Sequence, residues 1–150
     1  MATWTGKLAQ RQIIAEITPI ATSSPVGPSL SGFFAQVSGG EITAAVEKIY
    51  IGGKAFPEVL CAPSEVGDIT LTKHYDSDMR TILKDIRLVV GRAYYSIKIY
   101  DTDCDIADQK SERVYSSALL VGLSEPEGDA SSGAPATIAL TFAVSGAPSQ

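Results

Sequence analysis

Thr137-Ile-Ala-Leu-Thr-Phe-Ala-Val-Ser145 alternates large apolar side chains with small or hydroxyl-bearing ones along its whole length. Successive side chains of an extended chain point to opposite faces, so one face of this segment is strongly apolar and the other carries only Thr, Ala and Ser. The large side chains are Ile138, Leu140, Phe142 and Val144. The pattern predicts a half-buried strand, and it decides the fold class because the same period returns upstream.

The period of two recurs in both preceding segments. In the segment 93–100, Tyr95, Ile97 and Ile99 share one face; in 113–123 the alternation of Tyr115, Leu119, Val121 and Leu123 is less regular. Three shorter segments, 33–37, 46–51 and 69–75, are also expected to be strands, whereas 12–17 fits a strand or a helix. The chain is therefore predicted to be mainly β.

One segment follows a helical period instead. Its apolar residues are spaced by three and four, and they are Met79, Ile82, Leu83, Ile86 and Val90. Asp76 or Ser77 can cap the first turn, and Gly91 is placed to end the helix. The pattern predicts one amphipathic α-helix over about 77–90, which closes a mouth or face of the β-structure or, alternatively, recruits a partner through its charged face.

The length and the breaker residues set the organisation. A chain of 150 residues, 45% of them hydrophobic, predicts a single domain over 1–150. The Pro- and Ser-rich segment 18–31 and the segment 125–136 are expected to be long loops, and 146–150 a flexible tail.

The charge excludes one class of function. The net charge is −5, the pI is about 4.8, and residues 114–150 contain no Lys or Arg. A protein that grips nucleic acid through phosphates needs clustered cations, so this chain suits a surface past which a polyanion slides.

No run approaches the roughly 18 apolar residues of a membrane span. The start of the chain lacks the apolar stretch of a secretory signal, so synthesis and retention in the cytoplasm are expected.

The window Asp101–Glu112 resembles a calcium loop in part. Carboxylates stand at its first, third, fifth and twelfth places, but Ile106 stands at the sixth, where an EF-hand requires Gly, and strands flank the window where an EF-hand has helices. We interpret the window as an acidic, exposed connection and keep a calcium-binding module as an alternative. Its acidic residues are Asp101, Asp103, Asp105, Asp108 and Glu112.

No arrangement of residues predicts catalysis. His74 is the single histidine and falls on the side of Thr70 and Thr72, where a surface or interface imidazole is expected. Cys61 and Cys104 are expected to be ordinary thiols, although a disulfide is the alternative. We predict that the protein is not an enzyme and assign no catalytic residue, no cofactor and no metal ligand.

The order of the segments carries a resemblance to a family. A strand of the form Thr70-Leu-Thr-Lys-His-Tyr-Asp76 leads into the helix and then into 91–100, and the closing segment 118–146 ends in Phe142-Ala-Val-Ser-Gly146. Over residues 32–146 this order resembles the tail tube proteins of bacteriophages, whereas residues 1–31 match no part of that pattern.

The resemblance implies a two-sheet sandwich or flattened barrel with one flanking helix. It also implies hexameric rings of identical subunits, stacked into a tube whose lumen conducts DNA during ejection. The implied partners are other copies of the chain, the tape measure, the terminator, and the tail tip or baseplate. The implied location is the virion tail, after synthesis in the cytoplasm of a bacterial host. Open sheet margins would then be paired by neighbouring copies, and the segments 18–31 and 101–112 would become ordered on assembly.

Other functions remain open on the sequence. The chain could be an inner tube subunit of a contractile injection system, or another phage structural protein such as a tail terminator or head decoration protein. A calcium-binding β-sandwich adhesion module and a small β-barrel hydrolase that uses His74 are more remote readings.

Overall fold

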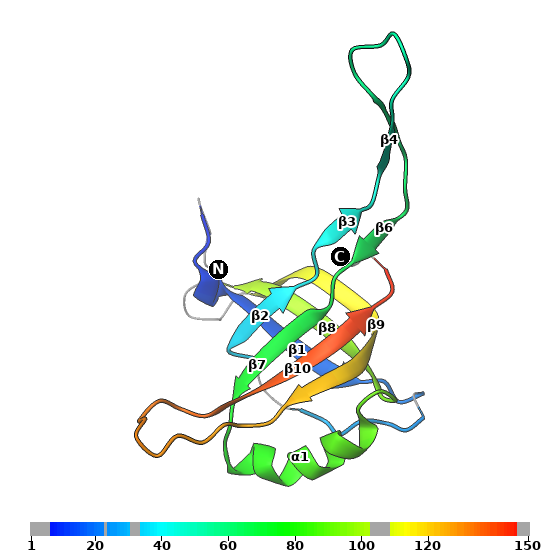
Figure 1. Ribbon diagram of the computed structural model, residues 1–150. Coiled ribbons are helices and arrows are strands. Elements are labelled where there is room, and N and C mark those ends of the chain that lie inside the picture. Colours follow the sequence, from blue (N-terminus) through cyan, green and yellow to red (C-terminus); the bar gives the residue numbers. More distant parts are fainter. Residues whose placement is uncertain (1–6, 23, 31–33, 103–108, 147–150) are drawn as a thin grey trace.

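The computed structural model describes residues 7–22, 24–30, 34–102 and 109–146, and it shows a curled β-sheet closed by a helix, with a long arm projecting from one end (Figure 1). The main sheet is antiparallel and has the strand order β1-β8-β9-β10-β7-β2. Its strands are β1 (Ile13–Pro19), β2 (Gln36–Gly39), β7 (Ile69–His74), β8 (Tyr94–Thr102), β9 (Gln109–Ser124) and β10 (Thr137–Val144). The mainly β prediction is confirmed.

Strand β10 lies between β9 and β7 and follows the predicted alternation. Ile138, Leu140 and Phe142 are each 1% exposed or less, while Thr137 on the opposite face is exposed. Phe142 meets Tyr95 of β8 edge to face, with ring centroids 5.7 Å apart and planes at 74°. This pair joins two strands across the interior of the curled sheet.

The margins of the main sheet approach each other. Ala15 of β1 and Phe34, just before β2, form an antiparallel bridge in which the Phe34 amide donates to the Ala15 carbonyl at 3.1 Å. The sheet therefore curls into the predicted flattened barrel. The sheet margins were also expected to have unpaired backbone groups. At this bridge the expectation is wrong, because the curl lets the backbone of one margin hydrogen-bond to that of the other.

Shifts of register along β9 change which side chains face the core. Tyr95 pairs with Ala118 but Ile97 pairs with Tyr115, so Ser116 and Ser117 together oppose Ser96 in a β-bulge. Two further shifts lie between Ile99 and Tyr100 and opposite Thr141 and Phe142. As a result Leu120 is buried and Val121 is 39% exposed. The predicted inward face of Leu119 and Val121 is wrong, because the first bulge reverses the phase.

Helix α1 (Ser77–Val89) crosses the lower end of the barrel between β7 and β8 (Figure 1). The Asp76 carboxylate accepts the Met79 amide proton at 2.9 Å, which caps the first turn. The helix buries one apolar face against the barrel, consisting of Met79, Leu83, Ile86 and Val89. The predicted helix is confirmed to within one residue, and it closes one mouth of the barrel.

The ambiguous N-terminal segment is a strand. A 3-10 turn (η1, Gln10–Gln12) leads into β1, which includes the first two residues of the predicted loop 18–31. Further along that loop, the Tyr95 hydroxyl donates to the Pro28 carbonyl at 3.0 Å. Burial raises the pKa of Tyr95 to about 12, so the hydroxyl keeps its proton at neutral pH. The described part of the loop is thus fastened to the barrel.

The predicted loop 125–136 connects β9 to β10 and extends away from the barrel at its lower left in Figure 1. Within the described residues, no helix is long and apolar enough to cross a membrane.

Candidate assembly interface

Residues 41–66 leave the barrel as a long, narrow arm, drawn at the top of Figure 1. At its foot the Gly67 amide donates to the Glu41 carbonyl at 2.8 Å, and the Gly40 amide donates to the Asp68 carbonyl at 3.3 Å. Two short ladders follow: β3 (Ile42–Ala44) pairs with β6 (Ser64–Val66), and β4 (Glu47–Ile49) pairs with β5 (Glu58–Leu60). The arm is therefore a hairpin continuous with the barrel strands β2 and β7.

Gly39 lets the chain turn from β2 into the arm. Its φ is 92°, a left-handed conformation that favours glycine. A Cβ atom at this position would lie 2.0 Å from the carbonyl oxygen of Asp68, which is far inside contact distance. A side chain here would force the two strands apart, so the foot of the arm depends on this glycine.

The two ladders of the arm are not continuous. Between them lie Ala45 and Val46 on one strand, against Cys61, Ala62 and Pro63 on the other. The Val46 amide is bonded within its own strand, to the Ala44 carbonyl at 3.0 Å, and Pro63 has no amide proton to give. The unequal number of residues and the missing donors interrupt pairing at mid-arm.

The tip of the arm is an apolar, aromatic turn around Gly52 and Gly53. Gly53 has a φ of 86°, and the Lys54 amide donates to the Ile51 carbonyl at 3.1 Å. The aromatic side chains beside this turn, Tyr50 and Phe56, are 79% and 83% exposed. Lys54 and Glu58 form an exposed ion pair at 3.2 Å, which stabilises the tip little in water.

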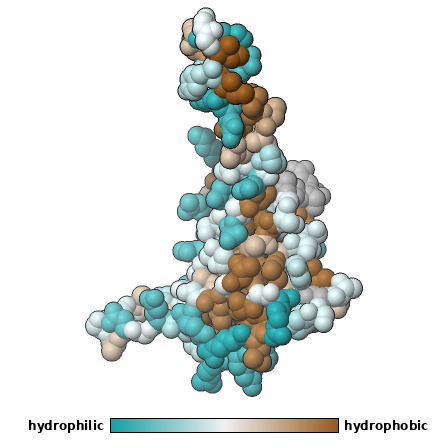
Figure 2. Space-filling view, turned by 45° about the vertical axis from the view of Figure 1, so that its right-hand side comes forward, coloured by the Kyte–Doolittle hydropathy of each residue, from teal (hydrophilic) through white to brown (hydrophobic). Residues whose placement is uncertain are grey.

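The arm has no core of its own. Every residue from 41 to 61 except Pro57 is exposed. Eight of these exposed residues are large and apolar: Ile42, Val46, Ile49, Tyr50, Ile51, Phe56, Val59 and Leu60. Figure 2 shows apolar surface along the arm. An isolated two-stranded hairpin is marginally stable in water, and contiguous exposed apolar surface marks interaction sites, so the arm is a candidate assembly interface.

The sequence indicated only part of the arm. A strand over 46–51 was predicted, and β4 occupies its middle; the glycine pair at 52–53 does mark a turn. Strands β3, β5 and β6, and the projection of the whole segment, were missed. The available signal was a cluster of apolar residues that keeps neither a period of two nor a helical period.

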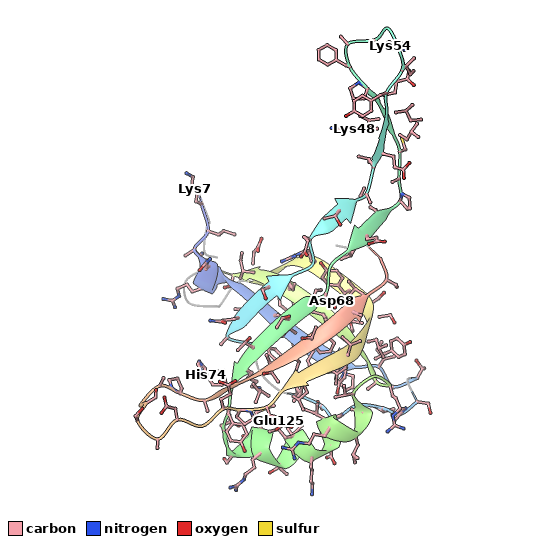
Figure 3. All side chains as sticks on the ribbon, in the orientation of Figure 1. Lys7, Lys48, Lys54, Asp68, His74 and Glu125 are labelled. Atoms are coloured by element: carbon pink, nitrogen blue, oxygen red, sulfur yellow. The ribbon has the colours of Figure 1, made fainter. Side chains whose placement is uncertain are left out.

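The side chains considered for catalysis do not come together. His74 is exposed at the lower end of β7, on the side of Thr70 and Thr72 as expected, whereas Cys61 is an exposed free thiol on the arm (Figure 3). These two side chains therefore lie apart, His74 on the barrel and Cys61 on the arm. Cys104 lies outside the described residues.

The acidic window 101–112 is described only at its ends. Asp101 is half-buried in β8, whereas Asp103, Asp105 and Asp108 lie outside the described residues, as does the side chain of Glu112. In the remainder of the chain no group of three or more His, Cys, Asp or Glu side chains is placed to hold a metal ion. The calcium alternative stays a prediction.

Glu125 begins the loop 125–136 and is held by helix α1. Arg87 donates from Nε at 2.6 Å and from its terminal nitrogen at 2.8 Å to the two carboxylate oxygens of Glu125 (the position of Glu125 is labelled in Figure 3). This hydrogen bonding lowers the pKa of Glu125 and raises the pKa of Arg87. Glu125 and Glu127 thus form an exposed acidic surface, one of them paired with a cation.

We expect Arg87→Gln to loosen the loop 125–136. Amide hydrogen exchange in the loop should become faster at neutral pH, but only about two- to fivefold, because an exposed ion pair contributes little to stability. The pKa of Glu125 is lowered in the fold, so the ion pair stabilises the loop fully at pH values above the ordinary pKa of a carboxyl group. This stabilisation is lost as the pH falls through the lowered pKa. The difference between variant and wild type should therefore vanish in acid. Arg80→Gln, on the same helix, is the control; equal effects of both variants would contradict the assignment.

The outer face of β2, β7 and β10 carries no charged residue over two rows of paired positions. Because these positions alternate with buried ones such as Leu71 and Leu140, they point away from the core. One row is Gln36, Thr72 and Ala139, and the next is Ser38, Thr70 and Thr141. We call this surface the uncharged wall. It matches the small and hydroxyl-bearing face expected of the closing strand.

No protein-family model matches the chain, and no curated protein matches it. Solved structures do match. A chain in the cryo-EM structure of the anti-feeding prophage cap, described as the AFP tube terminating cap, has a TM-score of 0.70 and 18% identity, over 97% of this chain and 91% of its own. This chain shares its fold with a chain of that structure.

Two further structures carry the same fold. The sheath/tube terminator of the extracellular contractile injection system PVC, in the extended state, gives a TM-score of 0.71 and 19% identity, over 95% of each chain. A chain in the PVC sheath-tube complex, also in the extended state, has a TM-score of 0.65 and 20% identity, over 92% of this chain and 87% of its own. The shared fold extends over nearly the whole length of each compared chain, and it agrees with the fold that the sequence resemblance implies.

Proposed function

We propose that the protein is a structural subunit of the tube in a contractile tail-like particle, where it assembles with copies of itself. The exposed arm carries the proposal: it is an apolar, core-less extension on a barrel that already has a complete core. The support from comparison is the fold, shared with structures titled as cap, terminator and sheath-tube complex.

A tube needs contacts that repeat. An element that projects from one end of a subunit and fits a different surface on the next copy makes a heterologous contact, and such contacts generate rings or open stacks. The arm has this form, since it stands at the end of the barrel away from α1 (Figure 1). We therefore assign the arm as the principal assembly element. The sequence patterns did not indicate this role, and they favoured the segments 18–31 and 101–112 instead.

The uncharged wall is our candidate for the surface that faces the lumen. It offers a passing polyanion neither a cation to bind nor a large apolar side chain to stick to. Residues 114–150 lack Lys and Arg, and their acidic residues, Glu125, Glu127 and Asp129, lie on the loop 125–136 and not on this wall. Passage of DNA and a hexameric ring belong to the proposal as expectations from the sequence resemblance.

Among the roles weighed on the sequence, the contractile injection system is now favoured over a bacteriophage tail tube, because the matching structures come from such systems. A chain in the six-fold symmetrised anti-feeding prophage baseplate also matches, with a TM-score of 0.66 and 14% identity over 97% of this chain and 95% of its own. Sheath, terminator and baseplate proteins are accordingly the proposed partners, and the particle's tail is the proposed location.

A tube terminator is the second candidate. The cap and terminator structures have TM-scores of 0.70 and 0.71, against 0.65 for the sheath-tube complex. A terminator would form one ring and stop, whereas a tube subunit would continue to stack.

Negative-stain electron microscopy of the purified protein, with sedimentation across a concentration series, tests the proposal. Long tubes or stacked rings support the tube subunit, and single rings support the terminator. Compact monomers at every concentration would refute both roles as self-assembling subunits.

A further inference from the structure

A second exposed apolar surface lies at the end of the barrel away from the arm. It combines the last turn of α1 with the outer face of β8 and β9, and we call it the basal patch: Leu88, Tyr94, Leu119 and Val121. Leu88 is 68% exposed, Tyr94 42% and Val121 39%. Figure 2 shows apolar surface on this side of the molecule, from the helix at the base towards the foot of the arm.

The four residues are brought together by backbone pairing. Tyr94 and Leu119 are directly paired across β8 and β9. The Gly91 amide donates to the Leu120 carbonyl at 2.6 Å, which fastens the end of α1 beside the same stretch of β9. The bulge at Ser116 and Ser117 reverses the phase of β9, so Leu119 and Val121 lie on its outer face. Contiguous exposed apolar surface marks interaction sites, so a covering partner is expected.

A hollow of about 290 Å³ borders the patch at Tyr94. Its lining consists of Ile20, Thr22, Ser24, Tyr94 and Ser117. Pockets for cofactors and drug-sized ligands enclose most of their ligand, so this open hollow suits a single inserted side chain better than a free small molecule.

The arm and the patch complement each other in chemistry but cannot meet within one molecule. The arm carries four Glu and two Lys, a net charge of −2, whereas residues 77–92 carry four cations and two Asp, and together with Glu125, which pairs with Arg87, their net charge is +1. The arm leaves the barrel at the end opposite α1 (Figure 1). Aromatic side chains are the usual anchors of protein interfaces, and the arm presents two at its tip.

We propose that the arm tip of one copy docks on the basal patch of another copy, with an aromatic ring of the tip in the hollow beside Tyr94. The inference rests on the proposed self-assembly and adds the surface that receives the arm. The contact is heterologous, since arm and patch are different surfaces, so each subunit gives one contact and receives one.

Photo-crosslinking maps the contact directly. p-Benzoylphenylalanine replaces Phe56, and labelled protein is mixed with an equal amount of isotopically heavy protein before assembly, so that links between copies are recognised by mass. We expect links from position 56 to residues 17–22 and 24 and to the segments 88–94 and 117–121 of another copy. In assembled particles, links that fall only elsewhere, for example on the strands of another arm, would overturn the inference and leave self-assembly intact.

Matched variants test the same contact without a probe. Leu88→Ser with Val121→Thr should raise the critical concentration for assembly about 10- to 100-fold, because two apolar side chains lose their cover. Ile13→Thr is the control, since Ile13 is also an exposed strand residue, at 37%, but lies outside the patch. Thermal melts check that all variants fold. Unchanged assembly of the double variant would overturn the inference, while failure of the wild type itself to assemble would refute the proposed function.

Discussion

We expect that replacing Tyr50 and Phe56 together by Ser abolishes assembly and leaves the barrel folded. Both rings are more than three-quarters exposed in the single chain, so their loss removes no packing from the core. Burial of one such side chain in an interface contributes about 1.5–3 kcal/mol. Losing two per contact should weaken association by a factor of about 10² to 10⁴, which takes assembly out of the micromolar range.

Sedimentation and negative-stain microscopy at matched concentrations check this expectation, with circular dichroism to confirm the fold. The control is Lys54→Ser with Glu58→Ser, which makes two changes in the same region but removes only an exposed ion pair. The control should assemble like wild type. If the aromatic variant assembled normally, the arm would not be the assembly element.

The second large effect concerns the core. We expect Phe142→Ala to lower the free energy of unfolding by about 3–5 kcal/mol, because a fully buried ring is removed and the surrounding strands cannot collapse into the space. Phe142 is 0% exposed and packs edge to face on Tyr95, which in turn holds the Pro28 carbonyl. A domain of ordinary stability, about 5–15 kcal/mol, would lose a large part of it.

Urea unfolding followed by fluorescence or circular dichroism measures this loss. Thr141→Ala is the control, since the neighbouring residue points to the uncharged wall and its truncation should change stability by less than about 0.5 kcal/mol. A loss below about 1 kcal/mol for Phe142→Ala would contradict its place in the core.

The elements that could be predicted from the sequence are those whose burial is regular. β10 alternates strictly because one face packs on the interior and the other faces outward, and α1 repeats at helical spacing because a single face lies on the barrel mouth. Both were predicted to within about a residue. In each case the burial of one face imposes a period that side-chain types record.

The irregular elements could not be predicted in the same way. A bulge adds one residue to one strand, so the phase of Leu119 and Val121 depends on the partner strand and not on their own spacing. The closure between Ala15 and Phe34 joins segments that are far apart along the chain, and no local pattern marks it.

The candidate site was missed for a different reason. Apolar residues such as Tyr50 and Phe56 are chemically the same whether they fill a core or wait for a partner, so composition alone assigns them to the core. Only the position of the segment, outside the barrel, distinguishes the two cases. The resemblance to tail tube proteins anticipated the general fold, but it could not say which surface makes contact.

The gap between the two ladders of the arm has a mechanical consequence. Ala45 and Val46 face a longer, proline-containing stretch without cross-strand bonds, so the outer ladder is joined to the inner one by covalent chain alone. A force on the tip then bends the arm at this joint before it disturbs Gly39 or the core. In a stack that flexes or twists, each subunit can follow its neighbour by pivoting at mid-arm while every barrel keeps its shape.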